Sequence, residues 1–321
     1  MLAVSCVSQS AEDPLSGLEV GEVDPPDPPE DWVTVDVKAA ALNHHDLWSL
    51  RGVGLPSERL PMILGCDAAG TTPEGEEVIV HAVIGDPEAG GGDETLDPKR
   101  SLLSEVHPGT LAERVAVPAR NLIGKPDSLS WEQAACMPTA WLTAYRMLTT
   151  RSGLDGPGSV LIQGAGGGVA TAAIVIGKAL GHTVHAASRD EAKREAALEL
   201  GADSVVKPGE KLGEKVDVAL ETVGEATWKH SLRSLKPGGR IVVAGATSGA
   251  SPDPELNRVF FLQLSVVGST MGTREELEAL TELLERSGAR PVISGTHPLS
   301  EARAAFEELE QGPSGKVVLT V

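Results

Sequence analysis

The glycines of the segment VLIQGAGGGVATAAIVIG have the clearest chemical meaning in this sequence. They lie between an apolar strand pattern and an apolar helix pattern. Glycine lets the backbone turn sharply and approach a phosphate closely, while the N-terminus of the next helix offers free N–H groups. The GxGxxG spacing is met only in a relaxed form, because Val169 stands at the third glycine. We expect a pyrophosphate site, with a ligand-free turn as the alternative, at Gly164, Gly166, Gly167, Gly168 and Val169.

A second group of residues follows the next predicted strand, 183–187. An NAD site usually places Asp or Glu there to bind the ribose hydroxyls, whereas this chain has Ser188 and Arg189, with Lys193 one helical turn later. A hydroxyl and two cations suit a 2′-phosphate, because Arg binds phosphate through paired donors. The residues therefore favour NADP(H) over NAD(H). The alternative is that both cations are solvated helix residues near Asp190.

Strands that alternate with helices must position these loops, and such alternation predicts a parallel sheet covered on both faces. Ligands collect at the carboxyl edge of such a sheet, so we also expect cofactor contacts from Gly245, Ala246, Thr270, Met271 and Gly272. The predicted strands are 160–163, 183–187, 204–206, 216–221, 240–244 and 264–268, and the predicted helices are 169–180, 190–200, 226–235 and 254–262.

The first part of the chain reads as β-rich. Strands are predicted over 32–41, 77–83 and 112–117, and a polar stretch of loop character covers 85–108. A helix is expected over 131–149, with Ser130 as its N-cap. In the last part of the chain the residue pattern predicts helices over 274–287 and 300–310 and a final strand over 316–321.

Composition excludes several classes of function. The net charge of −19 opposes binding of nucleic acid, because a phosphate backbone would meet an acidic field. The three cysteines form no CxxC pair and predict neither a disulfide framework nor a zinc cage. No basic leader and no long apolar run is present, so we expect a cytoplasmic protein without a membrane partner.

The order of several segments resembles the medium-chain dehydrogenase/reductase superfamily, in its quinone-oxidoreductase-like branch without zinc. The resemblance covers nearly the whole chain. It implies an α/β protein with a GroES-like catalytic domain, residues 1–125 with 290–321 returning to it, and a Rossmann domain, 126–289. It also implies a homodimer or a dimer of dimers, paired near 264–270, although that pattern fits a buried strand equally well. The segments are VKAAALNHHDLWSLRG, LPMILGCDAAG, GTLAERVAVPARNLI, LSWEQAACMPTAWLTAYRML, LKPGGRIVVAGATSG, QLSVVGSTMGTREEL and GKVVLTV.

The resemblance also implies that no metal is bound. The family's catalytic zinc ligands fall at Asn43, Cys66 and near Thr139, so only Cys66 and its neighbour Asp67 could coordinate a metal ion. The lobe for structural zinc falls in 85–108, which has no cysteine. Two ligands rarely hold a catalytic zinc. The rival interpretation is an unusual site built from His44 or His45 with Cys66 and Asp67.

Three residues are implied to serve catalysis. Asn43 matches the position whose amide faces the nicotinamide ribose and substrate, and His45 matches the position of the proton-relay hydroxyl, where an imidazole donates a proton near neutral pH. Thr143 matches a hydroxyl near the nicotinamide. An ordinary surface His pair and a Thr bonded to its own helix remain the alternatives. Lys316 could reach the cofactor or be a solvated lysine.

The sequence thus supports three functions. The first is an NADPH-dependent, zinc-independent oxidoreductase that transfers hydride to a quinone, an enone or another activated carbonyl compound as its small-molecule substrate. The second is a zinc-less alcohol dehydrogenase or a biosynthetic reductase with a narrow substrate. The third is a nucleotide-binding protein without turnover.

Overall fold

The computed structural model describes every residue from Met1 to Val321 and divides into two compact units. The N-terminal unit comprises 1–142, 271–285 and 290–321, and the Rossmann unit comprises 143–270 and 286–289. The sequence placed 126–142 and 271–285 in the cofactor domain. The structure differs because the helix starting at Trp131 packs on strands of the N-terminal unit, and because Gly272 and Arg274 hydrogen-bond to that unit.

The N-terminal unit is built on a seven-stranded sheet, in which alternating apolar side chains form one continuous core. Its order is β10-β6-β5-β3-β18-β17, with β9 paired to β3. A three-stranded sheet, β2-β1-β4, and the pair β7-β8 complete it. The strands are β1 (Leu2–Cys6), β2 (Leu18–Glu22), β3 (Trp32–Ala41), β4 (Met62–Ile63), β5 (Asp67–Thr71), β6 (Glu77–Val80), β7 (Val83–Ile84), β8 (Ser101–Leu102), β9 (Arg114–Pro118), β10 (Leu122–Gly124), β17 (Ile293–Pro298) and β18 (Lys316–Thr320).

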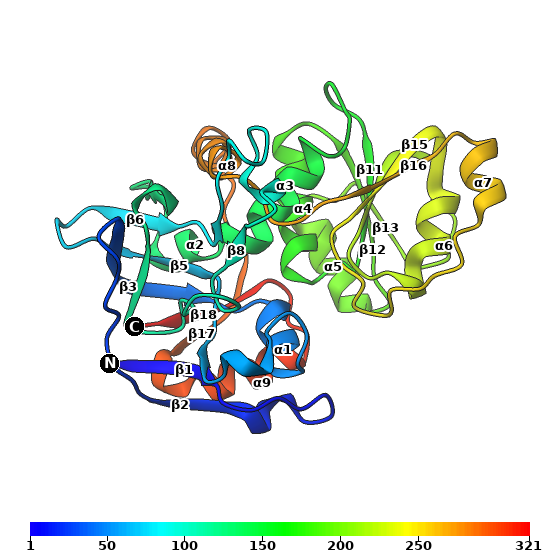
Figure 1. Ribbon diagram of the computed structural model, residues 1–321. Helices are drawn as coiled ribbons and strands as arrows, with labels where there is room; N and C mark the ends of the chain where they lie inside the picture. The colour runs from blue at the N-terminus through cyan, green and yellow to red at the C-terminus, as the bar shows by residue number, and fades with distance from the viewer. The chain divides into compact units, whose positions relative to one another are not determined.

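The end of the chain is an integral part of this unit. Strand β18 lies between β3 and β17, antiparallel to β3 and parallel to β17 (Figure 1, red beside blue). Helix α9 (Ala302–Glu310) places Phe306 in the core with no exposed surface. The unit also contains α1 (His44–Leu50), α2 (Trp131–Ala135) and most of α8 (Arg274–Ser287). Residues 290–321 therefore belong to the same compact unit as the first residues of the chain.

The Rossmann unit contains a six-stranded parallel sheet of order β13-β12-β11-β14-β15-β16. The order reverses between β11 and β14, as in doubly wound dinucleotide folds, and α4, α5 and α6 pack against the strands (Figure 1). The fold class is therefore the predicted one. The bounds are β11 (Ser159–Gln163), β12 (Thr183–Ala187), β13 (Ser204–Val206), β14 (Val216–Glu221), β15 (Leu235–Val243), β16 (Ser265–Gly268), α4 (Gly168–Ala179), α5 (Glu191–Glu199), α6 (Glu225–Ser234) and α7 (Leu256–Phe261).

The predicted helix over 131–149 is interrupted. Helix α2 is followed by a π-helical turn, η5 (Met137–Trp141), and then by α3 (Leu142–Leu148). Pro138 has no N–H to continue the α-helical pattern, so the backbone widens at this position. The Ser130 cap is confirmed, since its hydroxyl accepts a hydrogen bond from the Gln133 N–H. Several strands of the N-terminal unit were not predicted, among them β1, β2, β5, β10 and β17.

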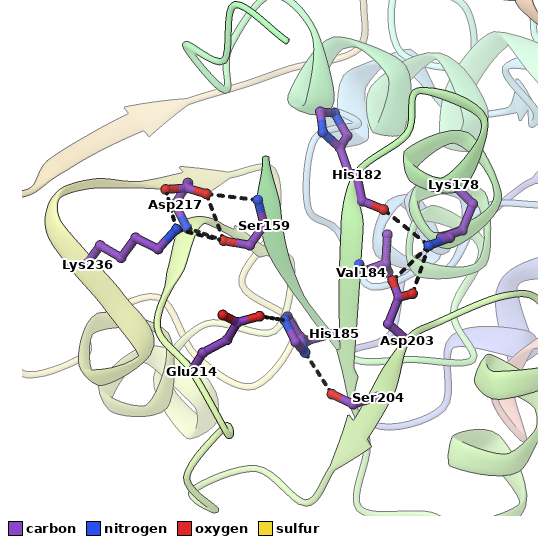
Figure 2. Close-up of polar contacts among 10 residues, drawn as sticks. All are labelled: Ser159, Lys178, His182, Val184, His185, Asp203, Ser204, Glu214, Asp217 and Lys236. Atoms are coloured by element: carbon purple, nitrogen blue, oxygen red, sulfur yellow. Dashed lines mark hydrogen bonds and ion pairs between the residues drawn. The ribbon is translucent and has the colours of Figure 1, made fainter. Parts of the chain in front are cut away.

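Ion pairs join neighbouring elements of the Rossmann unit at the amino ends of its strands, opposite the glycine loop (Figure 2). Asp217 accepts hydrogen bonds from the backbone and hydroxyl of Ser159 and pairs with Lys236 at 2.8 Å. Lys178 pairs with Asp203 at 2.8 Å in the same way. These charges are satisfied locally, so they stabilise strand alignment. No helix of either unit combines the length and the apolar composition needed to cross a membrane.

Replacing Phe306 by Ala tests the role of the C-terminal return. The side chain is fully buried, and truncation of a buried Phe costs about 3–5 kcal/mol. We expect F306A to lower the free energy of unfolding by that amount in a denaturant titration. The exposed neighbour Glu307 provides the control, because E307A should leave the midpoint nearly unchanged. Equal midpoints for F306A and wild type would contradict this packing.

Candidate functional site

The glycine loop joins β11 to α4 in a backbone conformation that needs glycine. Gly164 and Gly166 have φ angles of +72° and +111°, in the region that L side chains rarely adopt. Gly167 caps α4, so the first N–H groups of the helix, from Gly168 onward, have no partner within the helix. A cradle of free N–H groups at a helix N-terminus fits a pyrophosphate.

The cationic residues after β12 lie next to this loop. A Cβ atom on Gly166 would come within 2.5 Å of Cδ of Lys193, so the lysine side chain crosses the loop. Ser188 is buried at the strand end, whereas Arg189 is exposed. Arg194 donates to the carbonyl oxygens of Ser188 and Arg189 at 2.8 and 3.0 Å. The structure therefore places the Lys193 side chain on the glycine loop and fixes the backbone of Ser188 and Arg189 through Arg194, and the cofactor roles of Ser188, Arg189 and Lys193 stay predictions.

Other loops at the carboxyl edge of the sheet meet the glycine loop. A Cβ on Gly164 would lie 2.8 Å from Val223, and one on Gly245 would lie 2.9 Å from the Thr222 carbonyl oxygen. The backbone of 244–248 follows that of 221–223 through hydrogen bonds. Gly164 and Gly245 therefore lie at the same edge of the sheet, linked by Thr222 and Val223, which the sequence analysis did not select. Ala246 follows Gly245 in the same loop.

The remaining predicted cofactor residues lie where the chain passes from one unit to the other. Thr270 is the last residue of the Rossmann unit's main segment, and Met271 and Gly272 belong to the N-terminal unit. The Gly272 carbonyl accepts a hydrogen bond of 2.9 Å from His81. Thr143 is buried at the start of the Rossmann unit. Their cofactor roles stay predictions.

A buried charged network joins three segments of the N-terminal unit. The Lys316 ammonium donates to the Leu42 carbonyl at 2.7 Å, to Asn43 Oδ1 at 2.6 Å and to Asp67 Oδ2 at 2.9 Å. Asn43 Nδ2 also donates to Asp67 Oδ2 at 2.8 Å. Lys316 and Asp67 have at most 2% of their side chains exposed. All three ammonium hydrogens are used inside this unit, so Lys316 is not a solvated lysine.

Asp46 fixes the segment that carries this network. Its carboxylate is fully buried and accepts from the N–H of Asn43 at 2.8 Å and from that of Gly65 at 3.0 Å. Burial raises the pKa of Asp46, and His45 and the Asn43 N–H oppose that rise. Gly65 has φ +99°, and a Cβ there would meet Leu111 at 2.6 Å. The hydrogen bond from the Gly65 N–H to Asp46 holds the start of α1 next to the residue before Cys66.

His45 lies between a thiol and a carboxylate. Its Nε2 is 2.8 Å from Glu105 Oε1, and its Nδ1 is 3.6 Å from Cys66 Sγ. The thiol donates to the Leu103 carbonyl oxygen at 3.3 Å. Burial lowers the pKa of His45, but Cys66 and Glu105 more than offset this, so the pKa lies well above its usual 6.5. Burial raises the pKa of the Cys66 thiol, against the effect of His45.

The side chains around His45 are not arranged as zinc ligands are. Zinc needs three or four ligand atoms that converge on one point. The two nitrogens of His45 point instead to opposite partners, and Asn43 and Asp67 are held by Lys316. No group of three His, Cys, Asp or Glu side chains in the chain is arranged to hold a metal ion. The rival site from His45, Cys66 and Asp67 therefore does not fit this geometry.

Sequence reasoning missed Glu105, Arg194 and the role of Asp67 as the partner of Lys316. Glu105 lies 60 positions from His45, in a stretch without a motif. Thr139, in the π-helical turn that packs on β5, has a buried hydroxyl with no partner, as does one carboxylate oxygen of Asp67. Only the π turn could have been suspected, from Pro138 within a helical pattern.

Two protein-family profiles match the chain, one in its first part and one in its later part. The profile of the alcohol dehydrogenase GroES-like domain matches residues 29–127. The profile described as zinc-binding dehydrogenase matches residues 168–286.

Relatives match the chain over nearly its whole length. The acryloyl-coenzyme A reductase of Sulfurisphaera tokodaii is 30% identical, with 95% of this chain and 97% of that protein covered. A solved NAD-dependent alcohol dehydrogenase is 34% identical, with a TM-score of 0.92 and both chains fully covered. A 2-octenoyl-CoA carboxylase reductase solved with NADP and 2-octenoyl-CoA is 27% identical, with a TM-score of 0.89, covering 99% of this chain and 87% of that one.

Replacing Lys316 by Met tests the buried network. The change leaves the Asp67 carboxylate buried without its cation, and breaking a buried pair in this way costs about 3–5 kcal/mol. We expect a loss of that size in the free energy of unfolding of K316M at neutral pH. In the double variant K316M/D67N no unpaired charge remains, so part of the loss should be recovered. Equal losses in the single and the double variant would show that the charge pairing contributes little.

Proposed function

This chain belongs to the medium-chain dehydrogenase/reductase superfamily, and we propose that it is a zinc-independent reductase that uses NADPH to reduce a carbon–carbon double bond conjugated to a carbonyl group. The substrate class includes enones and enoyl thioesters. The position of the Lys193 side chain across Gly166 is the observation that carries the proposal.

The cofactor preference is supported by local charge. The chain as a whole has a net charge of −19, which disfavours an anionic ligand. Arg189 and Lys193 provide two cations next to the helix N-terminus, and the strand end has no carboxylate that would accept the ribose hydroxyls of NAD. Asp190 instead caps α5 by accepting from the Lys193 N–H at 3.1 Å. A 2′-phosphate would be bound by Ser188, Arg189 and Lys193.

The choice of substrate rests on the relatives. Acryloyl-coenzyme A and 2-octenoyl-CoA, named for two of them, are both α,β-unsaturated thioesters. Reduction of such a compound needs hydride at the β-carbon and a proton at the α-carbon. Among the activated carbonyl compounds that the sequence allowed, enones and enoyl thioesters are therefore favoured over quinones.

The residues of the chain have separate tasks in this proposal. The nicotinamide supplies hydride when it is bound. The glycine loop and the α4 N-terminus hold the pyrophosphate, and Gly245, Ala246, Thr270, Met271 and Gly272 belong to the cofactor-binding loops. Asn43 is oriented by Lys316 and Asp67, and Thr143 stays a candidate hydroxyl near the nicotinamide. His45, held as an imidazolium, is the proton source.

Alcohol dehydrogenation is the second candidate. Its support is the similarity to the NAD-dependent alcohol dehydrogenase, with a TM-score of 0.92. A zinc-type alcohol dehydrogenase needs convergent metal ligands to polarise the alcohol, and the chain has no such group of three ligands. A cytoplasmic location also stays a prediction, supported by three buried cysteines without disulfides.

We also propose that the chain pairs with a second copy through β16. This strand is the edge of the parallel sheet, and Val266 and Gly268 on it are exposed. Helix α7 adds three exposed apolar side chains to the same unit, with exposed fractions of 66–78%, at Leu256, Phe260 and Phe261. An unpaired edge and an apolar surface together are typical of an association site.

The proposed activity can be tested with metal-stripped protein. We expect NADPH oxidation with crotonyl-CoA or methyl vinyl ketone, and at least about tenfold tighter binding of NADPH than of NADH, which corresponds to about 1.4 kcal/mol. The double variant R189A/K193A should lose that preference. Nicotinamide fluorescence measures binding, and absorbance measures turnover.

The matched control is K178A/K236A, which removes two cations from the opposite edge of the same sheet (Figure 2). It should keep the preference for NADPH. Stronger binding of NADH by wild type would reject the cofactor assignment. Oxidation of alcohols without reduction of either unsaturated compound would favour the second candidate.

The β16 proposal predicts a change of mass in solution. A Lys at position 266 places a charge on the edge, where a second copy would have to bury it. We expect V266K to elute as a monomer in size-exclusion chromatography with light scattering, whereas wild type elutes as a dimer or larger. Val53 is similarly exposed, on the N-terminal unit, and V53K should keep the wild-type mass. A monomeric wild type would rule the dimer out.

A further inference from the structure

Three successive carbonyl oxygens at the end of β12 are occupied by donors of the Rossmann unit. The Ala187 oxygen accepts from the Ala165 N–H of the glycine loop at 2.9 Å. The oxygens of Ser188 and Arg189 both accept from Nη1 of Arg194, at 2.8 and 3.0 Å. The turn that follows β12 is therefore tied to the glycine loop on one side and to Arg194 on the other.

Arg194 reaches this turn from helix α5, which begins directly after it. Its side chain runs back toward the helix N-terminus, as long side chains in helices do. The Nη1 nitrogen carries two hydrogens, so it can serve both oxygens at once. The guanidinium also keeps its positive charge at every physiological pH. One side chain thus fixes the backbone of two residues and places a third cation near the turn.

The side chain of Ser188 keeps a hydrogen for a ligand. Its hydroxyl oxygen accepts from the Asp190 N–H at 3.3 Å, so its own hydrogen is left to be donated. The Lys193 side chain crosses the neighbouring Gly166 of the glycine loop. A phosphate needs donors and positive charge, whereas ribose hydroxyls are bound by an acceptor, usually a carboxylate. With its carbonyl oxygens occupied, the turn suits a phosphate better than a hydroxyl group.

We propose that Arg194 is a positioning residue that sets the preference for a 2′-phosphate over a 2′-hydroxyl group, because it occupies two carbonyl oxygens that would otherwise accept from the ribose. The inference rests on the proposed use of NADPH. It gives a role to a residue that the sequence analysis did not select, and it leaves direct contact with the phosphate to Ser188, Arg189 and Lys193.

Two effects of Arg194 act in the same direction. Its charge favours an anion close to the turn, and its hydrogen bonds remove two acceptors whose partial negative charge opposes a phosphate. Without Arg194 both effects are lost, so NADPH binds less tightly. NADH does not lose affinity in the same way, because its 2′-hydroxyl can donate to a freed carbonyl oxygen. Specificity is a difference of two affinities, so the ratio of the two Kd values reports this role.

Substitutions at position 194 separate the role in specificity from a merely structural one. R194M removes the charge and the donors but keeps an unbranched side chain. We expect it to lower the ratio of the Kd of NADH to that of NADPH about tenfold, the order of one charge-assisted hydrogen bond. R194K keeps the charge and three donor hydrogens, so it should retain most of the ratio. R194Q also removes the charge and gives the same test if R194M does not fold.

The matched control is an arginine that binds two backbone carbonyl groups elsewhere. Arg303, in α9 of the N-terminal unit, donates through Nη1 and Nη2 to the oxygens of Leu15 and Leu18, at 3.1 and 2.9 Å. R303M removes the same kind of contact and the same charge. We expect it to lower the stability of the fold and to leave the ratio of the Kd values unchanged.

The first measurement is a titration of full-length wild type and each variant with NADPH and with NADH, followed by nicotinamide fluorescence. The second is displacement of NADPH by adenosine 2′,5′-bisphosphate and by 5′-AMP, which differ only in the 2′-phosphate. R194M should weaken the bisphosphate and leave 5′-AMP unchanged.

The outcomes separate this inference from the proposed function. If wild type prefers NADPH and R194M keeps the same ratio, the role of Arg194 is overturned and the cofactor assignment stands. Equal weakening of both cofactors in R194M also overturns it, because that is the result of a general loosening of the fold. A wild type that binds NADH more tightly than NADPH rejects the cofactor assignment, and the role of Arg194 with it.

Discussion

The buried ammonium of Lys316 joins three segments of the N-terminal unit that are far apart in the sequence. A lysine without water must have its charge and its three hydrogens satisfied, because an unpaired buried charge costs several kcal/mol. Here Leu42, Asn43 and Asp67 supply the acceptors. These residues come from the end of the chain, from the segment after β3 and from the start of β5. The requirement of one cation therefore holds three remote segments in a single arrangement.

That arrangement decides what the neighbouring residues can do. Since Asn43 and Asp67 are held by a lysine, they are not ligands waiting for a metal ion. Since the backbone of this segment is fixed by Asp46, the imidazole of His45 faces Cys66 on one side and Glu105 on the other. A ring used through both nitrogens conducts or stores a proton, whereas a metal ligand must leave one lone pair free. This arrangement suits the proton-transfer role proposed for His45.

In the proposed function the Rossmann unit must bind an anionic cofactor although the protein as a whole is acidic. Its carboxyl edge gathers a helix N-terminus, Arg189 and Lys193, while Asp190 is used as a cap. At an ionic strength near the physiological one, charges more than about 8 Å apart are largely screened. Nearby cations therefore outweigh the distant surface carboxylates. Arg194 acts on the backbone of this loop, so a third cation orients the site without having to contact the ligand.

The sequence by itself determined the parts that depend on neighbours along the chain. The alternation of strands and helices, the glycine loop with its positive φ angles, the cap at Ser130 and the cations after β12 all follow from local periodicity and local charge. These features are encoded within a few residues of where they act, so the fold class and half of the candidate site could be predicted.

Only the tertiary structure decided which distant side chains meet. The partners of Lys316 lie more than 240 positions away, and Glu105 lies 60 positions from His45. No periodicity links such pairs, because their contact is set by how sheets and loops pack. The same reason explains the assignment of 126–142 to the N-terminal unit and the burial of a lysine that the sequence allowed to be solvated.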